Sequence, residues 1–368
     1  MTRRSPAAVL VAPTAFKGTL GPRDAARAMA AGVARVWPET HVLQRPVSDG
    51  GNGLLETYLA QERGVLEQLE VTGPLGERTP ARFVRSGATV VIESAEACGL
   101  HLTPPERRDP LAASTRGVGE LLLKARAVGA SEVILGLGGS ATVDGGSGMA
   151  RALGWILSGR AGDPVGEGGG SLIHLRRIDE PLERYAARVT ALCDVQNPLT
   201  GPNGAAAIYA PQKGAGPAQV EQLEAGLTCL AEVVRTDLGV DLADLPGAGA
   251  AGGLGAGARV FLGAELVAGS TWVLELGDLR RLVAGVDVLV TGEGRFDAQS
   301  SMGKITGRLL EIAAATGVCA LLVCGRIDDR PSGLAAKAVD GGGGILDFAD
   351  LVRLTERACR ELAVGGRL

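Results

Sequence analysis

The sequence predicts an α/β protein of two domains, with the second domain inserted into the first. The length of 368 residues exceeds the usual size of one hydrophobic core. Apolar, strand-like runs alternate with stretches of helical spacing. Three of these runs end in clusters of glycine and acidic residues, at 49–53, 136–148 and 291–297. Because ligands of open α/β sheets bind just beyond the carboxyl ends of strands, these clusters are the first candidates for a functional site.

The first quarter of the chain alternates strands and helices. A strand is expected at 8–12, an Ala-rich helix over about 22–36, a strand at 42–47 and a helix from about 54. This order is typical of a parallel sheet that helices cover on both faces. Further strands are expected in short apolar runs with helices between several of them, at 89–92, 133–137, 189–192, 286–290 and 320–323.

Breaks in composition indicate where one domain enters the other. Residues 74–76 (Pro-Leu-Gly) form one break, 158–171 is polar and Gly-rich, and 247–257 is nearly pure Gly and Ala. The last stretch could be a flexible linker, but it continues into helical spacing, which favours a helix start or close backbone packing at least as much. We predict an outer domain of residues 1–72 and 285–368 and an inserted α/β domain of residues 73–284.

Composition excludes several classes of function. With a net charge of −4, the chain has no broad basic surface for nucleic acid or an anionic membrane. The six cysteines lie mostly in apolar stretches without C-x-x-C spacing, so neither a disulfide framework nor a zinc site is expected, and reduced thiols fit a cytoplasmic protein. The apolar run near the start is interrupted by Pro13 and Lys17, so we interpret it as a strand and not as a signal peptide. No segment has the ~18 uncharged apolar residues of a membrane span.

The longest Gly-rich turn, Gly-Leu-Gly-Gly-Ser-Ala-Thr-Val-Asp-Gly-Gly-Ser-Gly at 136–148, lies between a predicted strand and a predicted helix. Glycine lets backbone N–H groups approach a ligand closely, and a helix N-terminus favours anions, so phosphate is the expected ligand. A tight turn that only needs positive φ is the alternative for any single loop of this kind. The relaxed dinucleotide pattern G-x-G-x-x-A is present, but no acidic residue ends a second strand at the required spacing, so NAD is a minor alternative.

Carboxylates are the expected bases, because the three histidines lie outside the Gly-rich loops. Carboxylates in such turns also suit Mg²⁺, which takes one or two of them together with substrate phosphates. Helix capping is a strong alternative for Asp49 and Asp144. A cap does not readily explain Asp194, which follows a predicted strand and precedes Val-Gln-Asn-Pro. Glu293 and Asp297 complete the set.

Lysines beside glycines provide compact positive charges for phosphate oxygens. Lys17 follows the first predicted strand and Lys304 precedes a predicted helix, although an ordinary solvated helix residue is equally expected for Lys304. Arg295 and Lys213 are weaker candidates of the same kind. Acids for Mg²⁺, cations for phosphate and Gly-rich loops together predict phosphoryl transfer.

Many short motifs also follow one another in a fixed order along the chain. They include Phe16-Lys17-Gly18, Asp49-Gly50-Gly51, Gly138-Gly139-Ser140-Ala141-Thr142, Cys193-Asp194-Val195, Pro211-Gln212-Lys213-Gly214-Ala215, Ala250-Ala251-Gly252-Gly253, and Gly292-Glu293-Gly294-Arg295 with Asp297, Gly303 and Lys304. In this order they resemble the bacterial glycerate kinase family, the type I glycerate kinases, over about 9–325.

The resemblance implies ATP- and Mg²⁺-dependent phosphorylation of D-glycerate, with 2-phosphoglycerate expected over 3-phosphoglycerate. It also implies a flavodoxin-like (Rossmann-like) parallel-sheet domain, an inserted α/β domain and an active site in the cleft between them. We expect a monomer or homodimer. The expected catalytic residues are Asp194 as base, its rival Asp49, and Lys17; the expected substrate or phosphate ligands are Gly138, Gly139, Ser140, Thr142, Arg295, Lys304 and Lys213; the expected metal ligands are Glu293 and Asp297.

The chain departs from the family pattern at several positions. Thr14-Ala15 stand where the family has Asp-Ser, Asn52 stands for Glu, and Val143 stands for Asn. Two alternatives to a glycerate kinase follow: a kinase of the same fold for another small hydroxy acid, and a weakened relative that binds a nucleotide or metabolite as a sensor. The retained charged residues argue against the second alternative.

Overall fold

The computed structural model describes residues 5–16, 18–61, 63–243, 245–301, 303–328, 336–344 and 346–364. The chain divides into two compact units. The outer unit comprises Met1–Arg63 and Gly269–Leu368, and the inserted unit comprises Gly64–Ala268. The expected active site in a cleft between the domains stays a prediction.

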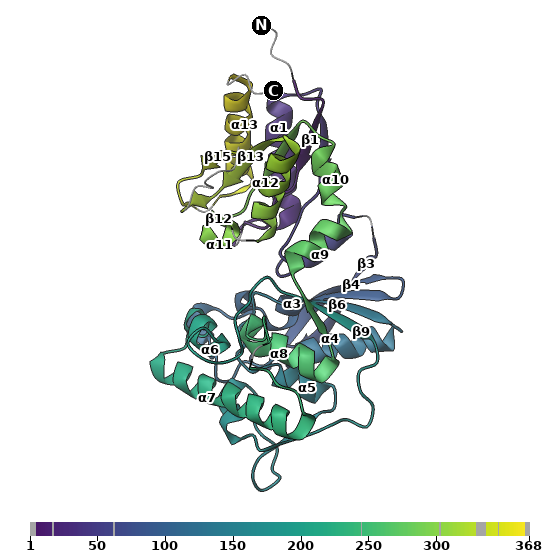
Figure 1. The fold of residues 1–368 in the computed structure, drawn as a ribbon, viewed down its shortest axis with the longest axis vertical. Helices are drawn as coiled ribbons and strands as arrows, with labels where there is room; N and C mark the ends of the chain where they lie inside the picture. Colours follow the sequence, from purple (N-terminus) through teal and green to yellow (C-terminus); the bar gives the residue numbers. More distant parts are fainter. Residues whose placement is uncertain are drawn as a thin grey trace. The chain divides into compact units, whose positions relative to one another are not determined.

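The outer unit is built on a five-stranded parallel sheet in the order β15-β13-β11-β1-β2 (Figure 1). Counted within the unit, this is the 2-1-3-4-5 order of flavodoxin-like folds, as the resemblance implied. Along the chain, the inserted unit lies between β2 and β11, the second and third strands of the outer sheet in sequence order. The strands are β1 (Ala8–Val11), β2 (His41–Gln44), β11 (Val288–Thr291), β13 (Cys319–Cys324) and β15 (Ala336–Asp340).

Helices cover both faces of this sheet because alternate strand residues point to opposite sides. Val9, Val288 and Leu321 pack with helices α1 (Pro22–Val36) and α13 (Phe348–Val364). Leu10, Leu289 and Leu322 pack with the helices of the other face. Those helices are α9 (Gly269–Leu276), α10 (Leu279–Ala284) and α12 (Ile305–Thr316); the shorter elements are α2 (Leu54–Leu59), α11 (Ala298–Ser301) and the paired β12 (Arg295–Phe296) and β14 (Arg326–Ile327).

The inserted unit has a six-stranded sheet in the order β10-β9-β6-β5-β4-β3. The first four of these strands are parallel, and β4 and β3 continue the sheet as an antiparallel hairpin. The strands are β3 (Val65–Thr72), β4 (Arg78–Ser86), β5 (Thr89–Glu93), β6 (Glu132–Gly136), β9 (Arg188–Leu192) and β10 (Glu265–Val267). A separate small ladder joins β7 (Ile156–Ser158) and β8 (Arg177–Asp179).

The core of the inserted unit lies where alternate strand residues such as Ile92, Leu135 and Ala191 meet the helices. The α-helices are α3 (Ser94–Cys98), α4 (Arg116–Ala127), α5 (Ser147–Ala152), α6 (Ala205–Tyr209), α7 (Pro217–Val233) and α8 (Ala250–Leu262). Short turns are η1 (Leu100–Leu102), η2 (Pro105–Arg107), η3 (Gly169–His174), η4 (Pro211–Lys213) and the π-type η5 (Val234–Leu238). In the part of the chain that the structure describes, no helix is both long and apolar enough to cross a membrane.

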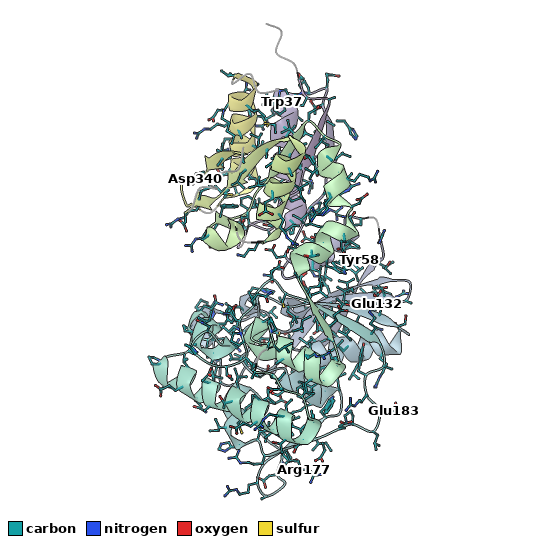
Figure 2. The ribbon with its side chains drawn as sticks, in the orientation of Figure 1. Trp37, Tyr58, Glu132, Arg177, Glu183 and Asp340 are labelled. Atoms are coloured by element: carbon teal, nitrogen blue, oxygen red, sulfur yellow. The ribbon has the colours of Figure 1, made fainter. Side chains whose placement is uncertain are left out.

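The unit boundaries differ from the predicted ones at 72/73 and 284/285. Strand β3 pairs along its whole length with β4, so residues 65–72 belong to the inserted unit. Helices α9 and α10 bury Val273 and Leu279 in the core of the outer unit. In the same unit, Tyr58, labelled in Figure 2, stacks on Trp272 of α9 with ring centroids 6.3 Å apart.

Candidate active site

Asp49 and Glu293 lie in loops that follow β2 and β11 at the carboxyl edge of the outer sheet. Asp49 Oδ1 accepts a hydrogen bond of 2.8 Å from the amide of Ile305, the first residue of α12. Glu293 Oε1 is buried and has no hydrogen-bond partner among the described residues. Burial, with the charge of Asp49 second, raises the pKa of Glu293 to about 7, while Ser300, Lys304 and Thr306 oppose the increase. The two acids therefore share one electrostatic environment.

Gly292 fixes where Glu293 leaves the strand. A Cβ at this position would lie 1.8 Å from the carbonyl oxygen of Val323, so a side chain would force β11 away from β13. The carbonyl of Gly292 accepts hydrogen bonds from Thr14 N at 2.9 Å and from Thr14 Oγ1 at 3.4 Å. Thr14, which stands where the family has Asp, thus ties the loop after β1 to the loop after β11. The strand order of a doubly wound sheet reverses between these two strands, where ligands typically bind.

The other predicted residues of the outer unit are placed differently. Asp297 Oδ1 accepts a hydrogen bond of 3.2 Å from the amide of Ser300, so this carboxylate caps the short α11. Arg295 is largely exposed and pairs with Asp328 at 2.5 Å. Lys304 is the N-cap residue of α12, half-buried and near enough to Glu293 to affect its pKa. Lys17 lies outside the described residues.

The Gly-rich loop of the inserted unit follows β6, as the sequence predicts. Backbone hydrogen bonds of 2.7 Å join Leu100 N to the carbonyl of Gly139 and Ala141 N to the carbonyl of Cys98. Ser140 is 4% exposed and Thr142 is fully buried. Gly139, in contrast, is exposed and has φ +64°. Within the described ranges, the amides of Gly138 and Gly139 donate no hydrogen bond, and such amides are suited to an anion.

Lys213 contacts this loop from within the unit. Its Nζ donates hydrogen bonds to Ser140 Oγ at 3.0 Å and to the carbonyl oxygen of Thr142 at 2.6 Å. The side chain is buried, and this burial lowers its pKa to about 8, against opposing effects of Cys98 and Asp144. The structure thus brings together three of the predicted phosphate ligands, but the lysine is engaged by the protein itself.

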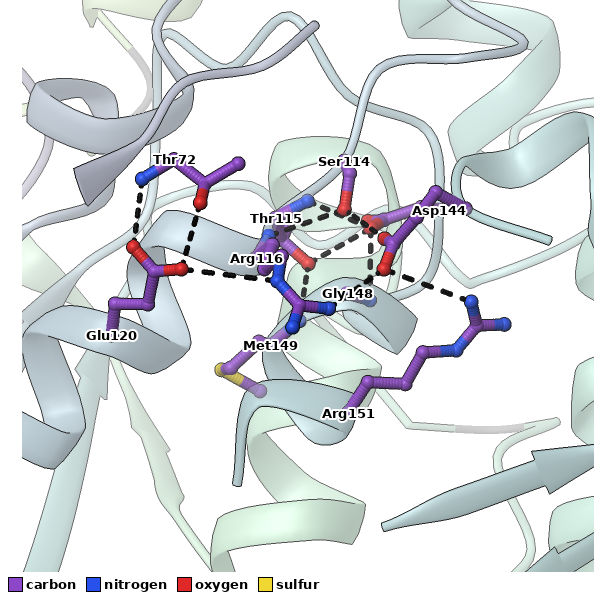
Figure 3. Close-up of polar contacts among 10 residues, drawn as sticks. Thr72, Ser114, Thr115, Arg116, Glu120, Asp144, Gly148, Met149 and Arg151 are labelled. Atoms are coloured by element: carbon purple, nitrogen blue, oxygen red, sulfur yellow. Dashed lines mark hydrogen bonds and ion pairs between the residues drawn. The ribbon is translucent and has the colours of Figure 1, made fainter. Parts of the chain in front are cut away.

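Asp144 is a helix cap, one of its two interpretations from the sequence. Its Oδ2 accepts from Thr115 N at 2.8 Å, Thr115 Oγ1 at 2.9 Å and Gly148 N at 3.2 Å (Figure 3). Its Oδ1 accepts from Gly146 N at 3.2 Å. Thr115 Oγ1 in turn accepts from Met149 N at 3.0 Å. Burial raises the pKa of Asp144, and these hydrogen bonds oppose the increase. One carboxylate therefore joins the N-terminal ends of α4 and α5.

Asp194 is half-buried in the segment that follows β9. Strands β9 and β6 are neighbours, and the amide of Leu137 donates to the carbonyl of Leu192 at 3.0 Å. Asp194 and the Gly-rich loop therefore leave the same edge of the inserted sheet. The carboxylate is close enough to Cys193 to contribute to the raised pKa of that thiol, which burial mainly causes.

The sequence analysis did not identify Thr115 as the partner of Asp144. It also did not resolve how the start of α8 supports the Gly-rich loop that follows β6. Ala251 has φ +52°, and Gly252 and Gly253 are also left-handed. Gly145 N donates to the carbonyl of Gly252 at 3.1 Å, and a Cβ on Gly252 would lie 1.9 Å from the carbonyl oxygen of Thr142. The run of small residues at 247–257 was the available signal, and both a helix start and close backbone packing, rather than a flexible linker, were correct interpretations of it.

The outer carboxylates fit Mg²⁺ that is bound together with a nucleotide. No cluster of three or more metal-binding side chains occurs among the described residues, so the protein alone offers no complete cage. Mg²⁺ commonly uses one or two carboxylates and completes its coordination with water and phosphate oxygens. The buried, unpartnered Oε1 of Glu293 beside Asp49 matches this requirement.

Comparisons with known proteins agree with the motifs. The model of the glycerate kinase family matches residues 9–362. A protein named glycerate kinase from Halalkalibacterium halodurans is 38% identical over 97% of each chain, and one named glycerate 2-kinase from Escherichia coli K12 is 44% identical over 81% of this chain and 79% of its own. A crystal structure described as a candidate glycerate kinase 2 of Salmonella typhimurium LT2 superimposes with a TM-score of 0.81 at 36% identity, over 98% of this chain and 99% of the other.

Proposed function

The chain belongs to the glycerate kinase family and is a kinase, and we propose that it transfers the γ-phosphoryl group of ATP to D-glycerate. The product in this proposal is 2-phosphoglycerate, which the name of the Escherichia coli relative, glycerate 2-kinase, supports. The observation that carries the proposal is the pair Asp49 and Glu293 at the strand-order reversal of a flavodoxin-like sheet, with Lys304 beside it.

Each site residue has a role in the proposed reaction. Asp49 and Glu293 would hold Mg²⁺, with Asp297 as a further candidate ligand, and the metal would neutralise charge on the β- and γ-phosphates. Lys304 binds a phosphate oxygen at the start of α12, where the helix dipole adds to its charge. The amides of Gly138 and Gly139 donate to phosphate oxygens. Lys17 and Arg295 are proposed for the glycerate carboxylate; Arg295 would have to exchange its bond to Asp328 for this contact.

The chemical step forms one P–O bond and breaks another. The glycerate hydroxyl oxygen attacks the γ-phosphorus, Asp194 accepts the hydroxyl proton, and the bond between the γ-phosphorus and the bridging oxygen breaks to release ADP. Asp49 is the rival base in the alternative arrangement in which Glu293 and Asp297 hold Mg²⁺ without it. Because positioning and charge neutralisation supply most of the rate of phosphoryl transfer, the phosphate ligands matter as much as the base.

The departures from the family pattern affect the site unequally. Val143 is fully buried and packs in the core of the inserted unit. It therefore contributes apolar contacts at the position where the family has Asn. Thr14 keeps a hydrogen bond to the loop that carries Glu293. Asn52 is exposed, whereas Thr14 and Val143 are buried. Of these three residues, Asn52 is therefore the one whose side chain can most readily contact an acceptor substrate. A small hydroxy acid other than glycerate is therefore the alternative acceptor to include in any assay.

The test is ADP release from Mg²⁺ and ATP with purified protein, with D-glycerate, with other small hydroxy acids and without acceptor. Turnover that depends on D-glycerate supports the proposal. Turnover only with another acid changes the acceptor, and ATP binding without turnover would support the sensor alternative. A cytoplasmic location belongs to the same proposal and is supported by six cysteines that are all free thiols.

A further inference from the structure

We propose that Lys213 is a positioning residue: its buried ammonium group holds the Gly138–Thr142 loop in its phosphate-binding conformation and does not itself bind phosphate. The inference rests on the proposed function only in assigning phosphate to this loop. It changes the role that the sequence suggested for Lys213, from ligand to support.

The contacts of Lys213 favour support over ligation. The side chain is 3% exposed, and Nζ donates to Ser140 Oγ at 3.0 Å and to the carbonyl oxygen of Thr142 at 2.6 Å. Two of the three N–H donors of the ammonium are therefore used within the protein, and the burial of the side chain leaves the third little access to a ligand that enters from solvent. A phosphate that drew the ammonium outward would leave the buried oxygens of Ser140 and Thr142 without this partner.

The other side of the loop is held by backbone hydrogen bonds. Gly139 and Ala141 are joined to residues 98–100 by two bonds of 2.7 Å. The loop is thus fixed between this segment and Lys213, and its exposed part is Gly139 with the neighbouring half-buried Gly138. Fixing the buried residues in this way leaves the amides of Gly138 and Gly139 available to a ligand without the cost of ordering the loop on binding.

The charge of Lys213 is balanced within the same unit. The titratable groups that act on it against the effect of burial are Cys98 and Asp144. Burial raises the pKa of Cys98 to about 12, so the thiol is neutral at neutral pH and Asp144 is the group that favours the charged lysine there. Asp144 lies at the far end of the loop, where it caps α4 and α5. The segment 138–148 is therefore held at one end by a buried cation and at the other by a buried anion.

The test is hydrogen exchange in the absence of nucleotide, because a phosphate ligand has nothing to hold in that state. In Lys213→Met, the amides of Leu100 and Ala141 should exchange at least about tenfold faster than in the wild type, since their hydrogen bonds depend on the loop conformation. Lys213→Ala should behave similarly, and added propylammonium should slow exchange again by filling the space of the missing side chain.

Three further variants separate the possible roles. Lys304→Met should raise the KM for ATP without changing exchange at 138–142, because Lys304 is proposed as a ligand. Lys124→Met removes a partly exposed helix lysine and should change neither property. Ser140→Ala removes one acceptor of Lys213 and should accelerate exchange at Ala141 to a smaller degree; this variant decides the question if the Lys213 variants do not fold.

The outcomes distinguish this proposal from the proposed function. Unchanged exchange in folded Lys213→Met, together with a raised KM for ATP, would overturn the positioning role and make Lys213 a ligand. Faster exchange in a protein that shows no turnover with any acceptor would retain the positioning role and refute the kinase reaction. Faster exchange in Lys213→Ala but not in Lys213→Met, which keeps the side-chain volume without the charge, would assign the effect to lost packing and also overturn the role of the charge.

Discussion

Replacing Glu293 with Gln should stabilise the protein at alkaline pH while it removes activity. In the folded protein the pKa of Glu293 is raised to about 7 from an ordinary 4.5, mainly by burial and then by Asp49. The folded state therefore holds its proton between these two values, where the unfolded state releases it. Ionisation of the buried side chain therefore destabilises the fold; this cost is absent below about pH 4.5 and complete above about pH 7.

The size of the effect follows from the difference between the two pKa values. A change from 4.5 to about 7 corresponds to roughly 3 kcal/mol of unfolding free energy. Glu293→Gln, which cannot ionise, should gain up to this amount at pH 8 and little at pH 4.5. The loss of a carboxylate beside Asp49 should at the same time weaken Mg²⁺-dependent ATP binding.

Urea unfolding at pH 4.5, 6 and 8 without Mg²⁺ or nucleotide measures the difference, and Glu39→Gln on an exposed loop of the same unit is the matched control. The control should change stability by the same small amount at each pH. A Glu293→Gln difference that does not vary with pH, or that is larger at pH 4.5 than at pH 8, would refute the assignment of a strained, buried carboxylate.

Three more substitutions test the other charges. Asp144→Asn should lower the unfolding free energy by about 3 kcal/mol in thermal or urea unfolding, because an amide cannot accept the four hydrogen bonds that cap α4 and α5; a change near zero would exclude the capping role. Lys304→Met should lower kcat/KM for ATP about tenfold in steady-state assays, in line with one lost charge–phosphate contact; unchanged kinetics would remove it from the site. Asp194→Asn should lower kcat by roughly 10²- to 10⁴-fold with unchanged unfolding, and retained kcat would transfer the role of base to Asp49.

The sheet of the outer unit was predictable because its strands are short, continuous apolar runs. The strands predicted at 8–12, 286–290 and 320–323 correspond to β1, β11 and β13. The β3–β4 hairpin was missed, since both strands contain many charged and polar residues in place of a continuous apolar run, and about half of each strand faces solvent. This omission also misplaced the first domain boundary, because only the pairing with β4 assigns 65–72 to the inserted unit.

The candidate site was predictable in residue types but not in orientation. The loops that carry Asp49, Glu293 and Gly139 follow strands as expected, because that position depends on local sequence alone. The inward direction of Lys213 depends on acceptors 71 and 73 residues away, and the capping role of Asp144 depends on Thr115, 29 residues away. Such long-range partners leave no mark in local spacing.

The central claim is transfer of a phosphoryl group from ATP to D-glycerate, and phosphorus NMR of the reaction tests it most directly. Purified protein with Mg²⁺, ATP and D-glycerate should convert the ATP signals to those of ADP and produce an equal amount of a phosphate monoester on carbon 2 of glycerate. ADP accompanied only by inorganic phosphate, or no consumption of ATP in the presence of D-glycerate, would contradict it.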